Sequence, residues 1–433
     1  MPVDLSPAGR PSVYPPRMRF WPWAAAWFVC NVFGPVIVLL AWPKGEPASG
    51  FRFWTWVVGA PNGLFLVLLG FARAGYEVLW SRAYWRNHHR DRWLAEKIHF
   101  AQRPLQVLAA GYCLPLGGKS LADVLAGKRS ILKAQAPRHG PGKVLCNRFE
   151  DNAPLLTALP RAGEEESEGD DADVLTEGAP AVQLIRVAVE PLVATIQALT
   201  RYEKTYWPQV RVLVGPEASD VRVAQVREAL RLAALPPLEV QAVPAAEGLL
   251  VADGWLDARE HRPLLAVAAA WYDDAIAEGC TEGCAAVLFD AGYFRLPQEV
   301  SPKATLHRPV QGNNGEAGYG FANAAVWGKV KAAAVTRAWI TRPVEHCDRA
   351  LTAAGFQAAS KDAAQCRLDR IVGNASAANG LLAIAAAIEA GAADGPQLIV
   401  DGLQSAILHV VPTKQTNAST HDDSQKQPAE HEA

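Results

Sequence analysis

A turn of small residues opens an apolar helix-like segment near the end of the chain. The stretch Val372 to Gly391 reads VGNASAANGLLAIAAAIEAG, and His346 precedes Asn374 by about thirty residues. An amide and an imidazole can both donate hydrogen bonds to a carbonyl oxygen as it gains negative charge, so this pair is suited to acyl transfer. The same stretch also suits a packed helix start, because glycine permits close backbone approach and Ser376 can cap a helix.

The nucleophile for such chemistry would be a cysteine. The seven cysteines show no CxxC pair and no disulfide framework, which indicates a reducing compartment. Cys280 and Cys284 with the adjacent His346 and Cys347 match the spacing of no common zinc module, so we predict neither a metal nor a cofactor. Between Cys146 and Cys280 the sequence contains no cysteine at all.

The elements that would position these residues alternate along residues 179–411. Apolar runs of strand length alternate with segments of helical periodicity, which predicts a layered α/β/α domain. A net charge of −2 excludes a global basic field for nucleic acid. The predicted strands are Ala181–Val189, Gln209–Val214, Leu238–Val243, Leu264–Ala270, Cys284–Asp290 and Gln397–Asp401. The predicted helices are Val221–Ala234, Asp348–Ala354 and Leu381–Glu389, with Ala324–Ile340 as a helix or a helix followed by a strand.

Residues 1–72 carry two apolar runs that predict a two-helix transmembrane hairpin. Trp21 to Pro43 and Phe53 to Phe71 contain no Asp, Glu, Lys or Arg. Each run is close to the roughly 20 residues that cross a hydrocarbon core as a helix. Aromatic rings and arginines favour the membrane–water interface. The residues expected there are Trp21, Trp23, Trp42, Trp54, Trp56, Arg73, Arg82 and Arg86.

Basic residues set the expected orientation of the hairpin. Three arginines precede the first run and a cluster of basic residues follows the second, whereas the connection holds only Lys44 and Arg52. The positive-inside rule then predicts a bacterial inner-membrane protein with both termini and the main domain in the cytoplasm. A cleaved signal peptide is the alternative for the first run, but no small-residue cleavage pattern follows it.

Three further segments surround the predicted domain. Residues 73–159 are expected to be a juxtamembrane helical and connecting region, in which Ala74–Phe100 would lie along the cytoplasmic membrane surface as a helix. Residues 160–178 are acidic and lack aromatic residues, which predicts a flexible linker. Residues 412–433 are polar and predict a disordered tail.

Two motifs carry a resemblance to a known family. Gly373–Leu382 is similar, without gaps, to the turn of thiolase-like condensing enzymes, and Asn374 at its second place resembles the initiating ketoacyl synthases. His346 stands where that family has a histidine, and Glu282–Phe289 resembles its acidic-Gly-Ala strand near the end of the first half. The resemblance implies a thiolase-like fold with a cysteine at a buried helix start, roughly fifty residues before that strand. Since this sequence lacks that cysteine, Asn374 and His346 become vestigial candidates and no catalytic residue is predicted.

A thiolase-like domain without its nucleophile, behind a membrane hairpin, resembles the adaptor proteins encoded beside phospholipase effectors of bacterial type VI secretion. The resemblance implies a non-catalytic adaptor that binds the lipase in the cytoplasm and helps to load it on the secretion spike. Its partners would be the lipase, the spike protein and the lipid bilayer, with the Gln311–Gly320 loop or the former cleft as the docking face. Three alternatives stay open: a condensing enzyme or acyltransferase of the thiolase-like class, a membrane-bound immunity protein that neutralises a toxin, and a generic membrane scaffold.

Overall fold

A computed structural model describes residues 6–139, 141–151, 153, 180–273, 275–313, 317–392 and 395–412. The chain divides into two compact units, which we call the helical unit (residues 3–100) and the body (from residue 101 onward). The predicted linker, residues 160–178, lies outside the described residues, as does all of the predicted tail except its first residue.

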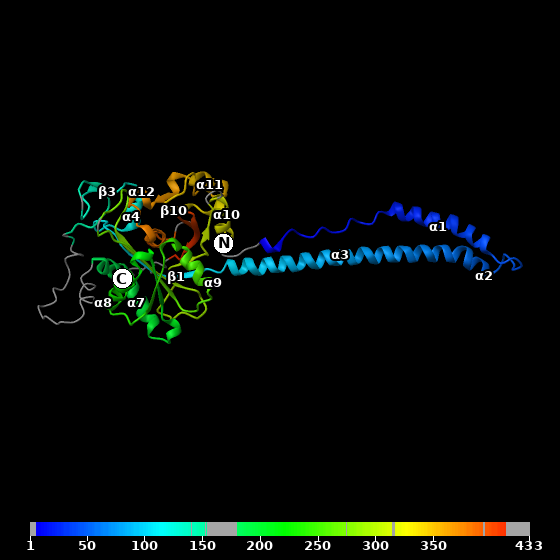
Figure 1. Cartoon of the computed structure of the whole chain (residues 1–433), viewed down its shortest axis with the longest axis horizontal. Helices are drawn as coiled ribbons and strands as arrows, with labels where there is room; N and C mark the ends of the chain where they lie inside the picture. Colours follow the sequence, from blue (N-terminus) through cyan, green and yellow to red (C-terminus); the bar gives the residue numbers. More distant parts are fainter. Residues whose placement is uncertain are drawn as a thin grey trace, which may run out of the picture. The chain divides into compact units, whose positions relative to one another are not determined.

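The helical unit contains the two predicted apolar helices. The first is α1 (Phe20–Ala41), and the second begins as α2 (Phe51–Trp54), passes through a π-helical turn (Thr55–Gly59) and continues as α3 (Ala60–Ala101). Helix α1 and the first part of α3 lie side by side (Figure 1). Both helices are long and apolar enough to cross a membrane, and α1 has no buried residue.

Polar side chains join α1 to α3 near the middle of α1. Asn62 Nδ2 donates to Asn31 Oδ1 at 2.9 Å, and Trp27 Nε1 donates to Asn62 Oδ1 at 3.1 Å. A Cβ atom at Gly34 would overlap the ring of Pro61, so the two backbones approach closely at this level. The polar groups of both asparagines are therefore satisfied within the pair of helices.

Helix α3 continues without a break far beyond its apolar part. From Phe71 to its end the helix adds about 45 Å at 1.5 Å per residue. An extended N-terminal segment runs along it, held by hydrogen bonds in both directions between Ser12 and Asn87 and by Arg90 Nε donating to Gly9 O at 3.1 Å. A helix that continues straight from an apolar span does not fit the expected placement of Ala74–Phe100 along the membrane surface.

The body is built on one mixed sheet of eleven strands among the described residues. Its path runs β11-β10-β12-β13-β8-β1-β7-β6-β4-β5, and β9 pairs with β13. The first half contributes β1 (Leu105–Cys113), β4 (Gln209–Val214), β5 (Glu239–Pro244), β6 (Leu264–Ala270) and β7 (Gly283–Asp290). The second half contributes β8 (Ala304–Leu306), β9 (Val310–Gln311), β10 (Arg337–Thr341), β11 (Gln365–Arg367), β12 (Gln397–Asp401) and β13 (Gln404–Val410).

The two halves repeat one topology. Read from its edge, the first half has the order β5-β4-β6-β7-β1 and the second has β11-β10-β12-β13-β8. In each half the first three strands in this order are parallel and the last two run antiparallel to their neighbours. The halves meet through the antiparallel pairing of β1 with β8. The body is thus an internal duplication, a feature that the sequence reasoning did not predict.

The helices occupy corresponding places in the two halves. The first half has α7 (Pro180–Thr200), α8 (Ser219–Leu232) and α9 (Leu250–Asp257), and the second has α10 (Ala317–Trp327), α11 (Cys347–Ala353), α12 (Leu368–Ile371) and α13 (Asn379–Glu389). A short helix α4 (Leu121–Ala126) and the hairpin β2 (Lys133–Gln135) and β3 (Val144–Cys146) complete the described elements.

The described residues of the body form three hydrophobic cores, each of which packs against the sheet. Along β7, the side chains of Ala285, Val287 and Phe289 join the core that contains α9 and α13, while the alternate residues join the core under α7 and α8. A third core lies between the second half of the sheet and α10 and α11. A strand with both faces buried reads as a continuous apolar run, as β7 does. The layered α/β arrangement expected for the body is confirmed.

Two element predictions were wrong. Ala181–Val189, expected as a strand, is the first half of α7, whose buried side chains recur at helical spacing against β1 and β7. Its apolar character therefore reflects core packing, although its length would also allow a membrane span. Residues 105–113, placed in the connecting region, form β1 at the centre of the sheet. Segment Ala324–Ile340 contains the end of α10 and the start of β10, which agrees with a helix followed by a strand.

Candidate functional site

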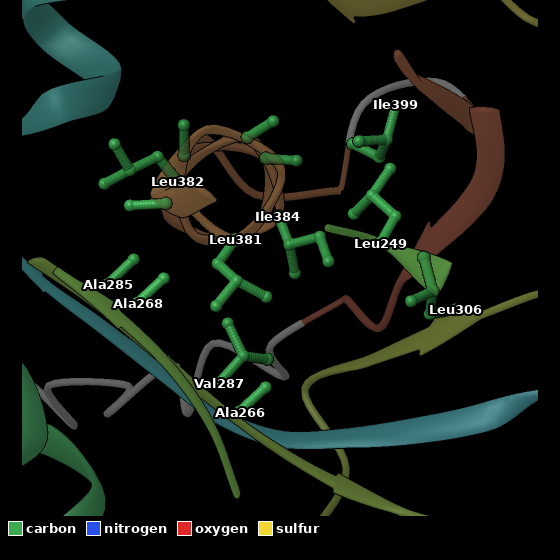
Figure 2. Close-up of a cluster of buried hydrophobic side chains, with 14 of the residues drawn as sticks. Leu249, Ala266, Ala268, Ala285, Val287, Leu306, Leu381, Leu382, Ile384 and Ile399 are labelled. Atoms are coloured by element: carbon green, nitrogen blue, oxygen red, sulfur yellow. The ribbon is translucent and has the colours of Figure 1, made fainter. Parts of the chain in front are cut away.

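The starts of α9 and α13 meet in the central core of the body. A Cβ atom at Gly380 would lie 2.8 Å from Leu249 Cδ2, so the second residue of α13 packs directly on the start of α9. Figure 2 shows Leu381 and Ile384 of α13 pointing toward Val287 and Leu249. Each helix follows the edge strand of its half, β5 or β11, so the duplication makes the two starts equivalent.

The start of α9 carries no thiol. The segment between β5 and α9 reads Ala245-Ala246-Glu247-Gly248-Leu249. A cysteine at such a position would be activated by the backbone N–H groups of the helix start. The only ionisable group in this segment is Glu247, and burial raises the pKa of its carboxyl group. The residue types at this helix start do not include the nucleophile that the resemblance implies.

The side chain of Gln404 in β13 forms hydrogen bonds with two backbone groups at this helix start. Its Oε1 accepts from the backbone N–H of Leu249 at 2.7 Å, and its Nε2 donates to Ala246 O at 3.0 Å. A Cβ atom at Gly248 would lie 2.7 Å from Gln404 Oε1, so glycine is required for this approach, and its φ of +46° also favours glycine. Gln404 is 7% exposed. A side chain of the second half therefore satisfies one N–H group and one carbonyl group at this helix start of the first half.

The start of α13 is organised by Asn374 and Asn379. Asn379 Oδ1 accepts from the N–H of Ala375 at 2.9 Å, so its Nδ2 is free to donate to Asn374 Oδ1 at 2.6 Å. Asn374 Oδ1 also accepts from the N–H of Ser376 at 2.9 Å. This chain of bonds fixes the orientation of both amides. Among the described residues, Asn374 Nδ2 has no hydrogen-bond partner, so the donor required for carbonyl binding is retained.

Asp401 lies beside the same helix start. Its side chain is fully buried, it accepts from Arg342 at 2.8 Å, and a Cβ atom at Gly380 would be 3.1 Å from its Oδ2. Burial raises the pKa of this carboxyl group, although Arg342 and the Gly380 N–H act in the opposite direction. Arg342 follows β10 directly, in the left-handed region at φ +46°. The residue directly after β10, Arg342, is thus held in an ion pair with Asp401, and His346 follows four residues later.

His346 does not join this site. It caps the start of α11 with a left-handed backbone, and its side chain is 66% exposed beside Glu345. The predicted pairing of His346 with Asn374 is not supported by this placement, because spacing along the sequence does not specify which side of the strand–helix connection a residue takes. Asn374 is the one member of the predicted pair that lies at the helix starts.

A second layer of contacts covers the Asn374 turn. The backbone of Asn374 pairs with Cys280, and Thr281 N donates to Asn374 O at 3.0 Å. Glycine is needed at Gly373, where φ is +108° and a Cβ atom would lie 3.0 Å from Gly279 O. The parallel bridge of Asn147 to Thr281 extends this small set of backbone pairs on its other side.

The acidic residue of the second motif holds the covering segment in place. Glu282 is 1% exposed and forms a bidentate ion pair with Arg138, and its Oε2 also accepts from the N–H of Phe149 at 3.0 Å. The guanidinium of Arg138 stacks 3.8 Å from the ring centroid of Trp271. The carboxylate therefore has a structural role, linking the β2–β3 hairpin to the start of β7.

With no cysteine between Cys146 and Cys280, these two and Cys284 are the cysteines to weigh as substitute nucleophiles, and their surroundings differ. Cys284 is fully buried in β7 opposite Cys113 of β1, and burial raises the pKa of both thiols, that of Cys113 to about 12. Cys146 is buried, and desolvation raises its pKa as well. Thiols with raised pKa values are weak nucleophiles. Cys280, half-buried beside Asn374, is the cysteine whose position is compatible with this turn.

No group of three metal-binding side chains occurs among the described residues.

The residues predicted to lie at the membrane interface are all in the helical unit. Trp21 and Trp23 are in the first turn of α1, Trp42 follows it and packs 5.1 Å from Phe53, and Trp54 and Trp56 lie in the first turns of the second helix. The three arginines, Arg73, Arg82 and Arg86, lie along α3.

Comparisons with solved structures find similar folds at low sequence identity. The chain is similar to the ishigamide ketosynthase/chain length factor, with 18% identity and a TM-score of 0.46, covering 71% of this chain and 99% of that one. It is also similar to a Streptomyces albus oxazolomycin ketosynthase domain, with 12% identity and a TM-score of 0.49, covering 72% and 75%. A third similar structure is the 3-oxoacyl-[acyl-carrier-protein] synthase III of Aquifex aeolicus, with 12% identity and a TM-score of 0.39, covering 70% of this chain and 99% of that one.

No protein-family model and no curated protein sequence matches the chain. Because each of these TM-scores is below 0.5, the likeness to the thiolase-like class depends on observations within this chain. These observations are the duplicated strand order and the two sequence motifs, Gly373–Leu382 and Glu282–Phe289. The motif Glu282–Phe289 forms β7, the last strand of the first half, as its resemblance implies.

Sequence reasoning missed Gln404, Asp401 and Arg342. A signal for the equivalence of the two helix starts is present, because Gly248-Leu249-Leu250 and Gly380-Leu381-Leu382 are the same tripeptide. Recognising this repeat would have identified the α9 start and its missing thiol. Nothing in the sequence marks the partner that Gln404 finds there.

Proposed function

We propose that this chain is a membrane-anchored, non-catalytic thiolase-like adaptor. It binds a phospholipase effector in the cytoplasm and helps to load it on the type VI secretion spike. The observation that carries the proposal is the occupation of the α9 start by Gln404, because an acyl thioester would need those same groups. Function follows from the site and not from the fold, so a filled site favours binding over catalysis.

The helical unit supports the tethering part of the proposal. Two apolar helices joined by satisfied asparagines form a hairpin that needs no other partner within a bilayer. A tether raises the local concentration of a bound effector near a membrane-bound machine. The proposed topology has both spans in the bacterial inner membrane and the body in the cytoplasm.

The docking face proposed for the effector includes the exposed side of α10, which begins at Ala317, within the segment Gln311–Gly320 that was expected to be a loop. Tyr319 is 52% exposed and Val326 is 47% exposed, and seven positions apart they share one face of the helix. An exposed aromatic and aliphatic pair of this kind is typical of a protein-binding surface.

Affinity capture and deletion test the adaptor function together. Tagged full-length protein, solubilised from its native membrane, is expected to recover a phospholipase and a spike component, and Tyr319→Ala with Val326→Ala is expected to weaken recovery. Deletion of the gene should stop secretion of the lipase. If deletion leaves secretion unchanged but exposes the cell to the toxin, the protein is an immunity protein; recovery of neither partner rejects the adaptor function.

A condensing enzyme or acyltransferase is the second candidate. It is favoured by the backbone pairing of Cys280 with Asn374 and by the free donor of Asn374. It predicts a mass increase on the protein when acyl thioesters are offered, which Cys280→Ser abolishes and Cys284→Ser does not.

A further inference from the structure

The helical unit contains a groove between α1 and α3 that the adaptor function does not use. Its volume is about 770 Å³, which is enough for part of a lipid-sized ligand. Its apolar wall is formed by Phe20, Trp23 and Trp27 from α1 and by Phe65 and Leu69 from α3. The groove lies at the end of the apolar segments where the extended N-terminal segment meets α1.

Two arginines stand at this end of the groove. Arg19 directly precedes α1 and Arg73 lies on α3, and both line the groove. Arg73 Nε donates to Glu77 Oε1 at 2.7 Å, with both side chains more than half exposed, whereas Arg19 has no ion pair among the described residues. Two guanidinium groups against one carboxylate leave an excess of positive charge beside an apolar wall.

We propose that this groove binds one phospholipid whose headgroup carries a net negative charge. The phosphate would lie at Arg19 and Arg73, because guanidinium groups match phosphate oxygens in pairs, and one acyl chain would lie along the aromatic wall. Cationic pockets between membrane helices on the cytoplasmic side recognise anionic headgroups in this way. The inference rests on the proposed membrane-spanning role of α1 and α3.

A lipid fits this groove better than a third membrane helix does. The polar groups of Asn31, Asn62 and Trp27 are already hydrogen-bonded within the hairpin. In the part of the chain that the structure describes, the groove therefore offers an incoming helix no such group as a partner. Its distinguishing feature is the charge at one end, which matches an anionic headgroup joined to an apolar chain.

The test measures lipid retention by the full-length protein in detergent. Phosphatidylglycerol and phosphatidylcholine are offered in equal amounts, and native mass spectrometry counts the bound lipids. We expect one phosphatidylglycerol to be retained about tenfold more strongly than phosphatidylcholine, and the double variant Arg19→Gln with Arg73→Gln to lose that preference. Equal retention of the two lipids by the wild-type protein, or an unchanged preference in the double variant, would overturn the inference.

Two controls separate charge from folding. Arg52→Gln removes an arginine from α2, outside the groove, and should retain the wild-type preference. The double variant Arg19→Lys with Arg73→Lys keeps the positive charge and should retain most of the preference for phosphatidylglycerol. Extraction of the wild-type protein from membranes by alkaline carbonate would instead reject the membrane span itself, so failure of the tether is distinguishable from failure of the lipid site.

Discussion

Gln404 Oε1 accepts a hydrogen bond of 2.7 Å from the backbone N–H of Leu249, across 155 positions of sequence. The bond joins a strand of the second half to the helix start of the first half. A helix start has N–H groups without partners inside the helix, and here Gln404 satisfies one of them. Gln404 thereby makes this helix start a contact between the two halves of the body.

Replacing Gln404 with alanine should destabilise the body. The change leaves the buried N–H of Leu249 without its partner, which costs about 1–3 kcal/mol, and it also removes the partner of the carbonyl of Ala246, an exposed residue. Denaturant-induced unfolding of the full chain in detergent measures the difference. Gln357→Ala is the matched control, because Gln357 is exposed and should shift the free energy of unfolding by less than about 0.5 kcal/mol. Equal midpoints for the two variants would show that the Gln404 bonds contribute nothing.

Replacing Asn374 with alanine should loosen the start of α13. The side chain of Asn379 is completely buried, and the variant removes the acceptor for its Nδ2 and for the N–H of Ser376. We expect a loss of about 1–2 kcal/mol in unfolding free energy. Asn374→Asp keeps the accepting oxygen and should lose less. If both substitutions prove equally harmful, hydrogen-bond acceptance is not the role of this side chain.

The ion pair of Arg138 with Glu282 should matter far more than an exposed pair. Arg138→Ala would leave the carboxylate of Glu282, 1% exposed, without its cation, and removal of one partner of a buried pair costs about 3–5 kcal/mol. The matched control is Arg201→Ala, which breaks an exposed pair with Glu299 that is worth at most about 1 kcal/mol. Thermal unfolding of both variants compares the two losses, and similar shifts would contradict the structural role of Glu282.

His307 should make the body sensitive to acid. Desolvation lowers the pKa of this imidazole to about 4, and the nearby His409 and Lys329 act in the same direction. A folded-state pKa below the unfolded value of about 6.5 means that the full stability is present above pH 6.5 and is lost as the pH falls toward 4. The loss attributable to this group is about 3 kcal/mol.

The pH dependence of unfolding tests this assignment. His307→Leu should flatten the fall in unfolding free energy between pH 6.5 and pH 4, relative to the wild-type protein. Gln357→Ala provides the control, since it changes no titratable group and should leave the shape of the profile unchanged. A His307→Leu profile parallel to that of the wild type would remove His307 as the source of acid sensitivity.

Continuous apolar runs identified much of the sheet from the sequence. The residues of β6 and of most of β7 are apolar on both faces, and β4 and β12 each have one apolar face, so these strands are recognisable by composition and length alone. Ala181–Val189 has the same composition but continues to Thr200 as a helix, because a short apolar run does not distinguish a buried strand from a buried helix. Strand β1 was missed because it follows a long aromatic and basic helix and precedes elements of three to six residues.

The site was predictable only in part. Asn374 was identified because the turn around it is a local pattern of small residues, and local patterns are readable from sequence. The residues that contact the two helix starts are distant in sequence. Cys280 and Asp401 lie beside the start of α13 and Gln404 lies at the start of α9, and the pairing of distant strands brings them there. His346 matches the resemblance by spacing only, and the structure agrees with the alternative of a helix-start or surface histidine, because spacing from Asn374 does not determine which residue of the β10–α11 connection turns inward.

We propose that the protein is a binder and not a catalyst because Gln404 occupies the α9 start, and the intact mass of the full-length protein after incubation with acyl thioesters tests this proposal most directly. The account predicts that no acyl group is added to the wild-type chain. Stoichiometric addition of one acyl group, lost on replacement of Cys280 with serine, would contradict it.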